Sequence, residues 1–448
     1  MEADPPVRGE RRWLALPLAV VALAGSCGAG AGDGATQAGP ASSEAPLPVA
    51  VALRDSLEVD PLDVGMDPAT LARLDSIVLR ALRDGAAPGA ALAIGRHGRL
   101  VRLRGYGVLD RATGTAVTSN SLYDLASLTK VVGTTTAVAA LEQEGRIALD
   151  RTVASYLPWW PGGQPGKERV TVRQLLLHRA GLPAFRAWFR DIAGEDAYRE
   201  ALAAEPLEWE PGTRTVYSDL GAMTLGLLVA EVSGMSLDRF LAERVWEPLG
   251  MDDTGFRPDS SVRARTAPTE LDTIWRGYHV HGVVHDENAF AVGGVAGHAG
   301  LFSTARDLSV FAQMMLGGGS VPGCGPAGAA AFPCVPGTDS ARILDPGTVD
   351  RYTRRHDPDQ SRALGWDTPT GQSAAGDYFG ERAFGHTGFT GTSIWIEPDL
   401  DLFVILLTNR INPTRANQRH VPLRREVHDL AATAILDRPV PLRRPGLR

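Results

Sequence analysis

The chain has 448 residues, 44% of them apolar, and carries a formal net charge of −7 with acidic and basic residues interspersed. This length and composition can bury a sizeable core in one large domain or two ordinary ones, which excludes a wholly disordered chain. The lack of clustered positive charge argues against nucleic acid as a main partner, because a phosphate-binding surface requires such clusters.

The N-terminal segment has the pattern of an export signal. A basic run, RGERR, precedes WLALPLAVVALAG, an apolar stretch too short to span a bilayer comfortably. Small residues then precede Cys27, and this ending resembles a bacterial lipobox, in which Cys27 becomes the lipidated first residue. Ordinary signal-peptidase cleavage nearby is the alternative. We therefore predict a signal peptide over residues 1–27, export to the cell envelope or periplasm, and membrane contact only through an N-terminal lipid anchor.

The next segments predict a tether, a helix and a hairpin. Residues 28–55 are small, polar and proline-rich, as in a flexible tether. DPATLARLDSIVLRALRDG follows with helical periodicity and a stop at Gly85. Its apolar face is Leu71, Leu74, Ile77, Val78, Ala81 and Leu82. ALAIGRHGRLVRLRGYG reads as two strands joined at Arg96-His97-Gly98.

Helical periodicity dominates the middle of the chain, and strands return near its end. Residues 125–320 are mostly helical in pattern, and a capping box from Thr304 to Asp307 starts one helix. GTSIWIEPD and DLDLFVILLTN are predicted strands, followed by a C-terminal helix. Strands at both ends with helices between them predict an α+β fold. In that fold, one antiparallel sheet built from N- and C-terminal strands is flanked by helices, with the active site beside an inserted helical subdomain.

The predicted domain covers residues 56–436, with the helical subdomain at roughly 145–370 and a C-terminal tail at 437–448. Cys324 and Cys334 bracket a short Gly- and Pro-rich loop within it. In an oxidising compartment, a short loop closed by two cysteines is most simply a disulfide. A metal site needs more ligands of this type than the segment offers.

Lysine is almost absent from the chain. Arginine supplies 43 of the 45 basic residues, and the two lysines are Lys130 and Lys167. Lys167 lies in the loop PGGQPGKERV and is interpreted as solvated. Lys130 follows Ser127 by three residues in the apolar stretch LASLTKVVGTTTAVAALEQEG, so a helix would place both side chains on one face of its first turn.

A base must activate a serine hydroxyl before it becomes a good nucleophile. A lysine that desolvation keeps neutral can be that base, whereas arginine stays protonated. Lys130 is therefore interpreted as the base for Ser127. The alternative is a lysine that snorkels beside an incidental serine.

Two later motifs extend this pair. Tyr217-Ser218-Asp219 opens a predicted helix, and Gly385-His386-Thr387-Gly388 precedes a late strand. Ser-x-x-Lys, then Tyr-x-Asn/Asp, then Lys/His-Thr-Gly is the ordered signature of the penicillin-recognising serine hydrolases. Over residues 65–435 the chain resembles the class C β-lactamase-like branch of that superfamily, which contains DD-peptidases, D-aminopeptidases and esterases. VTVRQLLLHRAGLP and GGVAGHAGLFSTARDL also resemble the family.

The resemblance implies a role for each motif residue. Ser127 would form an acyl-enzyme, and Lys130 and Tyr217 would handle its proton. The backbone N–H groups of Ser127 and Phe389 would form the oxyanion hole. Asp219, where the family usually has Asn, would orient Lys130 or the substrate. The predicted substrate-binding and oxyanion residues are Asp219, His386, Thr387, Gly388 and Phe389. No cofactor is implied.

One position departs from the family pattern. His386 replaces the lysine of Lys-Thr-Gly, and an imidazole is mostly neutral at pH 7. A permanent positive charge for a substrate carboxylate is therefore missing from this triplet. This favours esters or other amides over β-lactams or D-Ala-D-Ala. Because no class A-type deacylating glutamate is evident, activation of water would fall to Tyr217.

Histidines crowd one later segment densely enough to suggest zinc. The metallo-hydrolase pattern H-x-H-x-D-H fails there, because Val283 stands where its aspartate belongs. GVVHDENAFAVGGVAGHAGLFS also resembles a family loop that borders the site, so no metal is predicted. The residues whose roles stay open are His279, His281, His285 and His298, the last interpreted as a structural loop residue. His178 and His428 are interpreted as capping or surface residues.

These patterns predict a metal-free serine hydrolase that acts by acylation and deacylation on small esters, amides or peptidoglycan-derived substrates. The alternative is a non-catalytic penicillin-binding or peptidoglycan-sensing lipoprotein that acylates without turnover.

Overall fold

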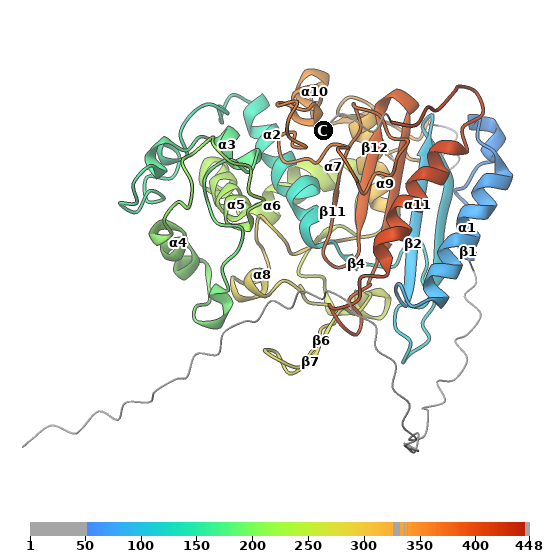
Figure 1. Cartoon of the computed structure of the whole chain (residues 1–448), viewed down its shortest axis with the longest axis horizontal. Helices are drawn as coiled ribbons and strands as arrows, with labels where there is room; N and C mark the ends of the chain where they lie inside the picture. Colours follow the sequence, from blue (N-terminus) through green and yellow to red (C-terminus); the bar gives the residue numbers. More distant parts are fainter. Residues whose placement is uncertain (1–51, 326–331, 336, 338, 444–448) are drawn as a thin grey trace, which may run out of the picture. The chain divides into compact units, whose positions relative to one another are not determined.

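A computed structural model describes residues 52–325, 332–335, 337 and 339–443 (Figure 1). The predicted signal peptide, Cys27 and residues 28–51 of the predicted tether lie outside these residues. The tether prediction needs a correction at its end. Strand β1 (Ala52–Arg54) pairs with the next strand but one, so the sheet begins inside the segment predicted as tether.

The central sheet has six antiparallel strands in the order β1-β3-β2-β13-β12-β11. Its other strands are β2 (Gly89–Arg96), β3 (Arg99–Gly107), β11 (Phe384–Thr387), β12 (Ser393–Glu397) and β13 (Leu402–Thr408). β13 pairs with β2 along its whole length, which joins the two ends of the chain at the middle of the sheet. The predicted α+β fold, with one sheet built from both termini, is confirmed.

The hairpin between β2 and β3 turns where the sequence predicts. His97 and Gly98 form the two-residue loop, and both have left-handed φ values, 50° and 69°. Such backbone angles suit the primed turns that match the twist of paired strands. At the sheet centre, every residue of β13 is buried, and its sequence LFVILLT is a continuous apolar run. A strand covered on both faces has this composition instead of an alternating one.

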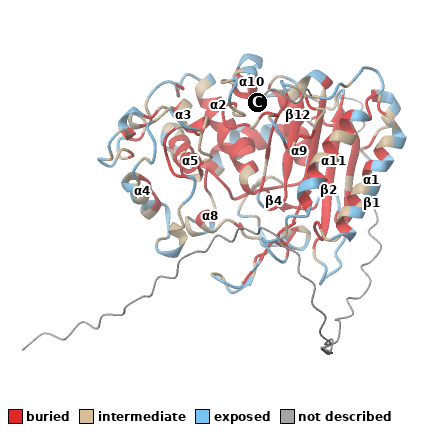
Figure 2. Ribbon diagram, viewed as in Figure 1, coloured by how far each residue is buried: buried red, intermediate tan, exposed pale blue. Residues whose placement is uncertain are grey.

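Helices cover both faces of the sheet. On one face, α1 (Pro68–Arg83) packs beside α11 (His420–Thr433), and the two contact β2, β3 and β13. On the other face, α9 (Ala305–Leu316) contacts β2, β12 and β13. Figure 2 shows the buried strands between these helices. The predicted range of the helical subdomain is therefore too wide, because α9 lies within 145–370 yet packs against the sheet.

A helical region is built around α5 (Asp219–Ser233), which contacts α2, α3 and α6. The other α-helices among the described residues are α2 (Thr136–Gln143), α3 (Val172–Leu176), α4 (Glu195–Ala204), α6 (Leu237–Leu241), α7 (Glu247–Leu249), α8 (Glu287–Ala291) and α10 (Pro346–Thr353). Among the described residues no single helix is long and apolar enough to cross a membrane. Together, α5 and 237–249 pass this test by length and composition, although a bend of 74° separates them. Most of α5 is buried in the core.

Short strands and helical turns complete the fold. The remaining strands are β4 (Tyr123–Asp124), β5 (Gly255–Phe256), β6 (Leu271–Asp272), β7 (Tyr278–His279), β8 (Leu301–Ser303), β9 (Ser320–Pro322) and β10 (Ser340–Arg342). Outside the site, helical turns span Pro61–Val64, Val153–Ser155, Lys167–Arg169, Trp188–Arg190, Ala242–Trp246, Ser260–Arg265 and Pro398–Leu400. Beside β9 and β10, a disulfide joins Cys324 to Cys334.

The end of the chain also differs from the prediction of a separate tail at 437–448. Asp437 forms an ion pair of 2.7 Å with Arg96, whose side chain is fully buried in the sheet. Arg443 donates a hydrogen bond of 2.7 Å to the backbone oxygen of Gly371. As far as residue 443, this segment is therefore attached to the domain by polar contacts that sequence periodicity does not reveal.

Candidate active site

Ser127 lies in a tight helical turn, η2 (Ala126–Leu128), that leads directly into η3 (Thr129–Thr135) and then α2. Its neighbour Ala126 has a φ of 47°, a left-handed conformation that is uncommon and strained for a residue other than glycine. The buried Asp124 carboxylate accepts hydrogen bonds from the Ala126 N–H at 2.8 Å and from the His285 N–H at 2.7 Å. These two bonds hold the turn that presents the serine.

Lys130 is 3% exposed, and its ammonium group has three partners. Its Nζ lies 3.0 Å from Ser127 Oγ, 2.9 Å from the backbone oxygen of His298 and 2.8 Å from Asp219 Oδ1. Burial by itself would lower the pKa of Lys130, but Asp219 and Tyr217 outweigh it and hold that pKa above its usual value. The expectation that desolvation keeps this lysine neutral is therefore wrong, because it did not include a buried carboxylate at contact distance.

Tyr217 is surrounded by basic side chains. Its ring centroid is 4.9 Å from Lys130 Nζ, 5.2 Å from the guanidinium carbon of Arg362, and 4.7 Å and 5.8 Å from the rings of His178 and His386. Within the described residues, the buried Tyr217 hydroxyl has no hydrogen-bond partner. The arrangement leaves this oxygen available to a proton or a substrate.

His178 corrects a prediction made from the sequence. It is buried in the wall of the site, not at the surface, and its Nδ1 accepts a hydrogen bond of 3.1 Å from the Ser218 N–H. Burial, followed by nearby positive charge, holds the pKa of His178 well below its usual value. Ser218 caps α5 by accepting a bond from the Gly221 N–H. His178 thus helps to place the first turn of α5, and with it Tyr217 and Asp219.

The His386-Thr387-Gly388 triplet ends β11 beside the nucleophile. His386 is 4% exposed, and burial lowers its pKa well below the usual value, so it is neutral. A Cβ atom on Gly388 would lie 2.4 Å from the backbone oxygen of Leu125. Only glycine permits this approach, which brings the backbone of Gly388 and Phe389 next to the turn that carries Ser127.

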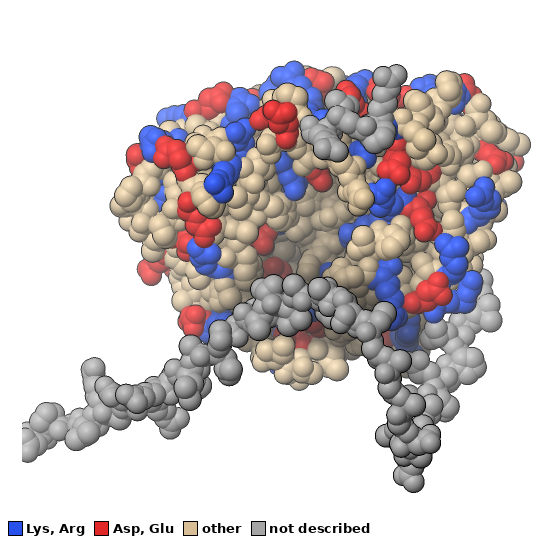
Figure 3. Space-filling view, in the orientation of Figure 1, with Lys and Arg blue, Asp and Glu red and all other residues tan. Residues whose placement is uncertain are grey.

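A cleft of about 370 Å³ is lined by the predicted site residues other than Lys130 and Asp219, and by three arginines that were not predicted from the sequence. Its lining includes Ser127, Tyr217, His386, Thr387, Gly388, Phe389, Arg362, Arg410 and Arg424. Where β11 faces the helical region, the molecular surface is hollowed, and both basic and acidic side chains border the hollow (Figure 3). The triplet itself has no cation, as expected, but the site as a whole does have permanent positive charge. No sequence signal marks these three arginines among 43.

The crowded histidines have separate partners within the protein. His285 Nε2 lies 2.9 Å from Glu270, and its ring stacks on Phe389. His298 Nε2 lies 2.8 Å from Asp286. The backbone oxygen of His298 accepts a hydrogen bond from Lys130, so this loop residue also supports Lys130. His279 and His281 contact backbone oxygens. In the described parts of the chain, no group of three or more His, Cys, Asp or Glu is arranged to hold a metal ion.

His428 also differs from its interpretation as a capping or surface residue, because it is a completely buried residue of α11. Its ring contacts Phe379 and Trp395, and its Nδ1 lies near the backbone oxygen of Arg424. Burial lowers its pKa to about 4.

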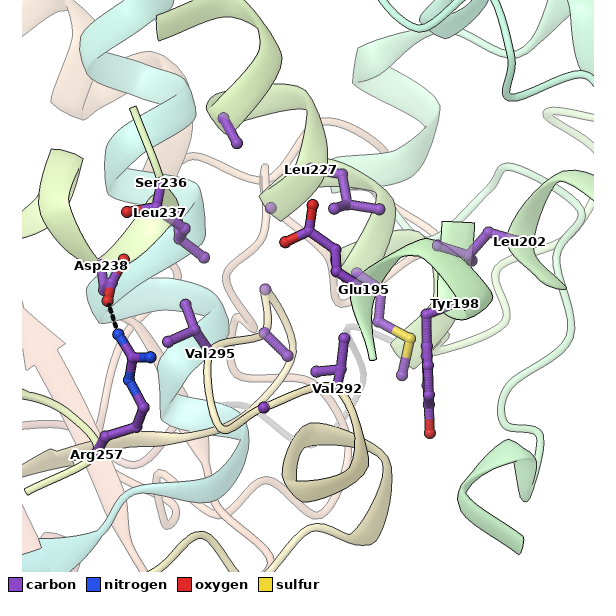
Figure 4. A pocket seen from close by; sticks show the side chains of 16 residues that line it. Glu195, Tyr198, Leu202, Leu227, Ser236, Leu237, Asp238, Arg257, Val292 and Val295 are labelled. Carbon is purple, nitrogen blue, oxygen red and sulfur yellow. Dashed lines mark hydrogen bonds and ion pairs between the residues drawn. The ribbon is translucent and has the colours of Figure 1, made fainter. Parts of the chain in front are cut away.

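A second pocket, of about 410 Å³, lies between α4, α5, α6 and residues 292–297, and shares no lining residue with the first (Figure 4). Its walls are mainly apolar, and Asp238 pairs with Arg257 at one side. It contains no predicted site residue.

Comparison with known proteins agrees with the fold and the motifs. Residues 74–429 match the model of the Beta-lactamase family. The chain belongs to this family. A protein of Salmonella schwarzengrund (strain CVM19633), provisionally named a D-alanyl-D-alanine carboxypeptidase, is 32% identical over 397 residues, which cover 81% of this chain and 88% of that protein.

Two solved structures show the same fold. A class C β-lactamase has a TM-score of 0.62 and 17% identity, and the match covers 81% of this chain and 98% of that one. A family VIII carboxylesterase has a TM-score of 0.61 and 22% identity, with coverage of 82% and 99%. Family membership confirms the resemblance stated from the motifs, and the protein is a β-lactamase-fold hydrolase.

Proposed function

We propose that this hydrolase works through an acyl-enzyme on Ser127. Ser127 Oγ attacks the substrate carbonyl carbon while Tyr217, acting as a phenolate, accepts the Oγ proton and becomes a neutral phenol, and the carbonyl π electrons move to oxygen. Collapse of this tetrahedral intermediate breaks the bond to the leaving group, which receives the proton from Tyr217. Water then repeats the sequence on the acyl-enzyme and releases the acid and free Ser127.

The supporting observation is the packing of Ser127, Lys130 and Tyr217 around one point. Lys130 is charged and already donates toward Ser127 Oγ, so in this proposal it stabilises the negative charge that passes between Ser127 and Tyr217. The N–H groups of Ser127 and Phe389 receive the oxyanion. The close approach of Gly388 to Leu125 supports this pairing of one donor from the turn after β11 with one from η2.

We propose that the preferred substrates are acyl compounds whose leaving group carries a carboxylate, as in a peptide that ends in D-Ala-D-Ala. Arg362 carries this part of the proposal. It lies over the Tyr217 ring, and its nearest ion-pair contact is with Asp367 at a distance of 3.9 Å. A cation beside the proton-handling tyrosine is placed to bind an anionic leaving group, and the name of the Salmonella relative agrees with this class.

Uncharged esters are the second candidate, favoured by the buried, neutral His386 in place of a cationic lysine. Esters were the class favoured by the sequence, and the arginines of the cleft are the reason for placing them second here.

A substrate panel with two variants tests these proposals. We expect the soluble domain to turn over an acylated D-Ala-D-Ala peptide with higher kcat/KM than a nitrophenyl ester or a cephalosporin. Arg362→Gln should raise KM for the peptide roughly ten- to hundredfold while leaving the ester almost unchanged. Mass spectrometry should find the acyl group on Ser127 and none on Ser127→Ala. A higher kcat/KM for the ester would select the second candidate, and a persistent adduct without turnover would support a penicillin-binding sensor.

We also propose that the protein is exported and anchored through a lipid on Cys27, on the strength of the N-terminal pattern alone. Cys27→Ser should move the protein from the membrane fraction to the soluble envelope fraction. Equal membrane fractions for the two proteins would exclude the lipid anchor.

A further inference from the structure

We infer that Arg424 is a positioning residue of the oxyanion hole, which holds and polarises the peptide group whose N–H belongs to Phe389. This inference rests on the proposed function, where that N–H is one of the two oxyanion donors. It assigns a role to a side chain of α11, a helix that contains none of the three sequence motifs.

Arg424 reaches the turn between β11 and β12 from α11. Its Nη2 atom donates hydrogen bonds of 2.8 Å to the backbone oxygens of Gly388 and Thr392. Arg410 supports the same turn from another direction, with Nε donating to the Phe389 oxygen at 2.8 Å. One guanidinium group therefore holds the Gly388 carbonyl, which precedes Phe389, and another holds the carbonyl of Phe389 itself.

The geometry of the peptide bond links this contact to the direction of the Phe389 N–H. In a trans peptide the carbonyl oxygen and the following N–H point in opposite directions. The Gly388 carbonyl points to Arg424, so the Phe389 N–H points away from it. Within the described residues that N–H donates no hydrogen bond, although Phe389 lines the cleft with Ser127. Fixing the carbonyl therefore fixes the direction of a donor that is free to receive substrate.

The charge of Arg424 adds to its positioning effect. The side chain is 9% exposed, and no carboxylate of the described residues lies within ion-pair distance. A charge-assisted hydrogen bond to a carbonyl oxygen draws electron density from the peptide group and makes its N–H a stronger donor. Burial, and then Arg410, lower the pKa of Arg424 to about 9, so it is still protonated at neutral pH.

The test compares Arg424→Gln and Arg424→Lys with Arg425→Gln. Arg425 is the next residue of α11 and pairs with Asp377 outside the cleft, so its variant removes one positive charge without touching the turn. We expect Arg424→Gln to lower kcat at least about tenfold, less than the hundredfold or more typical of deleting an oxyanion donor, with KM almost unchanged. Arg424→Lys should recover part of kcat, because an ammonium can still donate to Gly388.

The affinity for a phenylboronic acid distinguishes a role in the oxyanion hole from a merely structural role, which would leave this affinity unchanged. Ser127 Oγ adds to boron and gives a tetrahedral adduct whose oxygen occupies the oxyanion hole, as the transition state does. Affinity for this probe should fall in parallel with kcat/KM across the Arg424 variants and stay at the wild-type value in Arg425→Gln. An Arg424→Gln enzyme with kcat within twofold of wild type would overturn the inference. So would a loss of kcat without a matching loss of boronate affinity.

The wild-type reaction separates this inference from the proposed function. If wild type forms no adduct on Ser127 with substrate or boronate, the acyl-enzyme proposal fails. If wild type reacts and the Arg424 variants match it, only the role of Arg424 is excluded. Should Arg424→Gln not fold, the comparison of Arg424→Lys with wild type decides the question by the same boronate measurement.

Discussion

The two lysines of this chain occupy two different regions and have opposite electrostatic behaviour. Both are buried, with exposed fractions of 3% for Lys130 and 0% for Lys167. Lys130 contacts the Asp219 carboxylate beside Ser127, and its pKa is raised. Lys167 lies in the helical region, where burial lowers its pKa to about 8 and only Glu205 opposes this effect.

Lys167 closes the end of a helix. Its Nζ donates hydrogen bonds of 2.6 Å and 3.0 Å to the backbone oxygens of Leu202 and Ala203, in the last turn of α4, and lies 4.5 Å from the Trp160 ring centroid. The interpretation of Lys167 as a solvated residue is therefore wrong. Carbonyl groups at a helix C-terminus lack partners inside the helix, and a compact ammonium can satisfy two of them in little space.

The comparison shows what the scarcity of lysine indicates. Both lysines occupy buried spaces in which a compact ammonium donates several hydrogen bonds. A planar guanidinium has a different shape and would not fit these contacts. Whether such a lysine belongs to a catalytic site or a structural one depends on its partners. A carboxylate and a serine surround the first, and helix carbonyls and an indole surround the second.

The largest expected effect is on Lys130. Lys130→Arg and Lys130→Met should both lower kcat at least about a hundredfold while circular dichroism stays normal. Arginine keeps the charge but is longer, planar and permanently protonated, so it cannot reproduce the contacts with Ser127, Asp219 and His298. Steady-state kinetics measure the loss. An arginine variant within tenfold of wild type would show that positive charge alone is the function of Lys130.

A second expected effect concerns pH. Asp219→Asn removes the main group that raises the pKa of Lys130, so desolvation should dominate and lower that pKa. Because the charged lysine is the active form in our proposal, the alkaline limb of the kcat profile should move to lower pH by at least about one unit. Profiles of wild type and variant check this shift. An unchanged alkaline limb would mean that Asp219 does not maintain the charge of Lys130.

The corresponding change at Lys167 should affect stability and not catalysis. Lys167→Met leaves the Leu202 and Ala203 carbonyls without their donor, and we expect the free energy of unfolding to fall by about 1–3 kcal/mol. kcat should stay within twofold of wild type. Urea unfolding and steady-state kinetics on the same preparation test both statements, and a large loss of kcat in a stable variant would contradict the contrast between the two lysines.

The smallest expected effect is the pH dependence of that stability. The pKa of Lys167 is about 8 in the folded protein and 10.5 for an ordinary lysine, so between these values the unfolded chain binds the additional proton. The contribution of Lys167 to the free energy of unfolding should therefore rise with pH in this window, by less than about 1.4 kcal/mol per pH unit. Below pH 8 it should be flat. Subtracting the Lys167→Met profile isolates the slope, and a flat difference up to pH 10 would exclude the lowered pKa.

Local pattern was enough to predict much of this molecule. The spacing of Ser127 and Lys130 places them together on one helical turn, and Arg96-His97-Gly98 indicates a hairpin. The apolar run in DLDLFVILLTN predicts the strand that the structure has as β13. These features depend on helical period, turn chemistry and composition, which neighbouring residues determine. The ordered motifs also predicted which distant segments meet in the cleft.

Only the tertiary structure decided the electrostatics of the site. Lys130 is charged because Asp219 lies 2.8 Å from it, and the cleft is cationic because Arg362 and Arg424 arrive from segments without any motif. Lys167 is buried because the last turn of α4 packs against its ammonium group. Desolvation and Coulomb interactions depend on distance in space and on burial, and sequence separation carries neither quantity. The sequence by itself therefore determined which groups are present in the site, and the fold determined which of them carry charge.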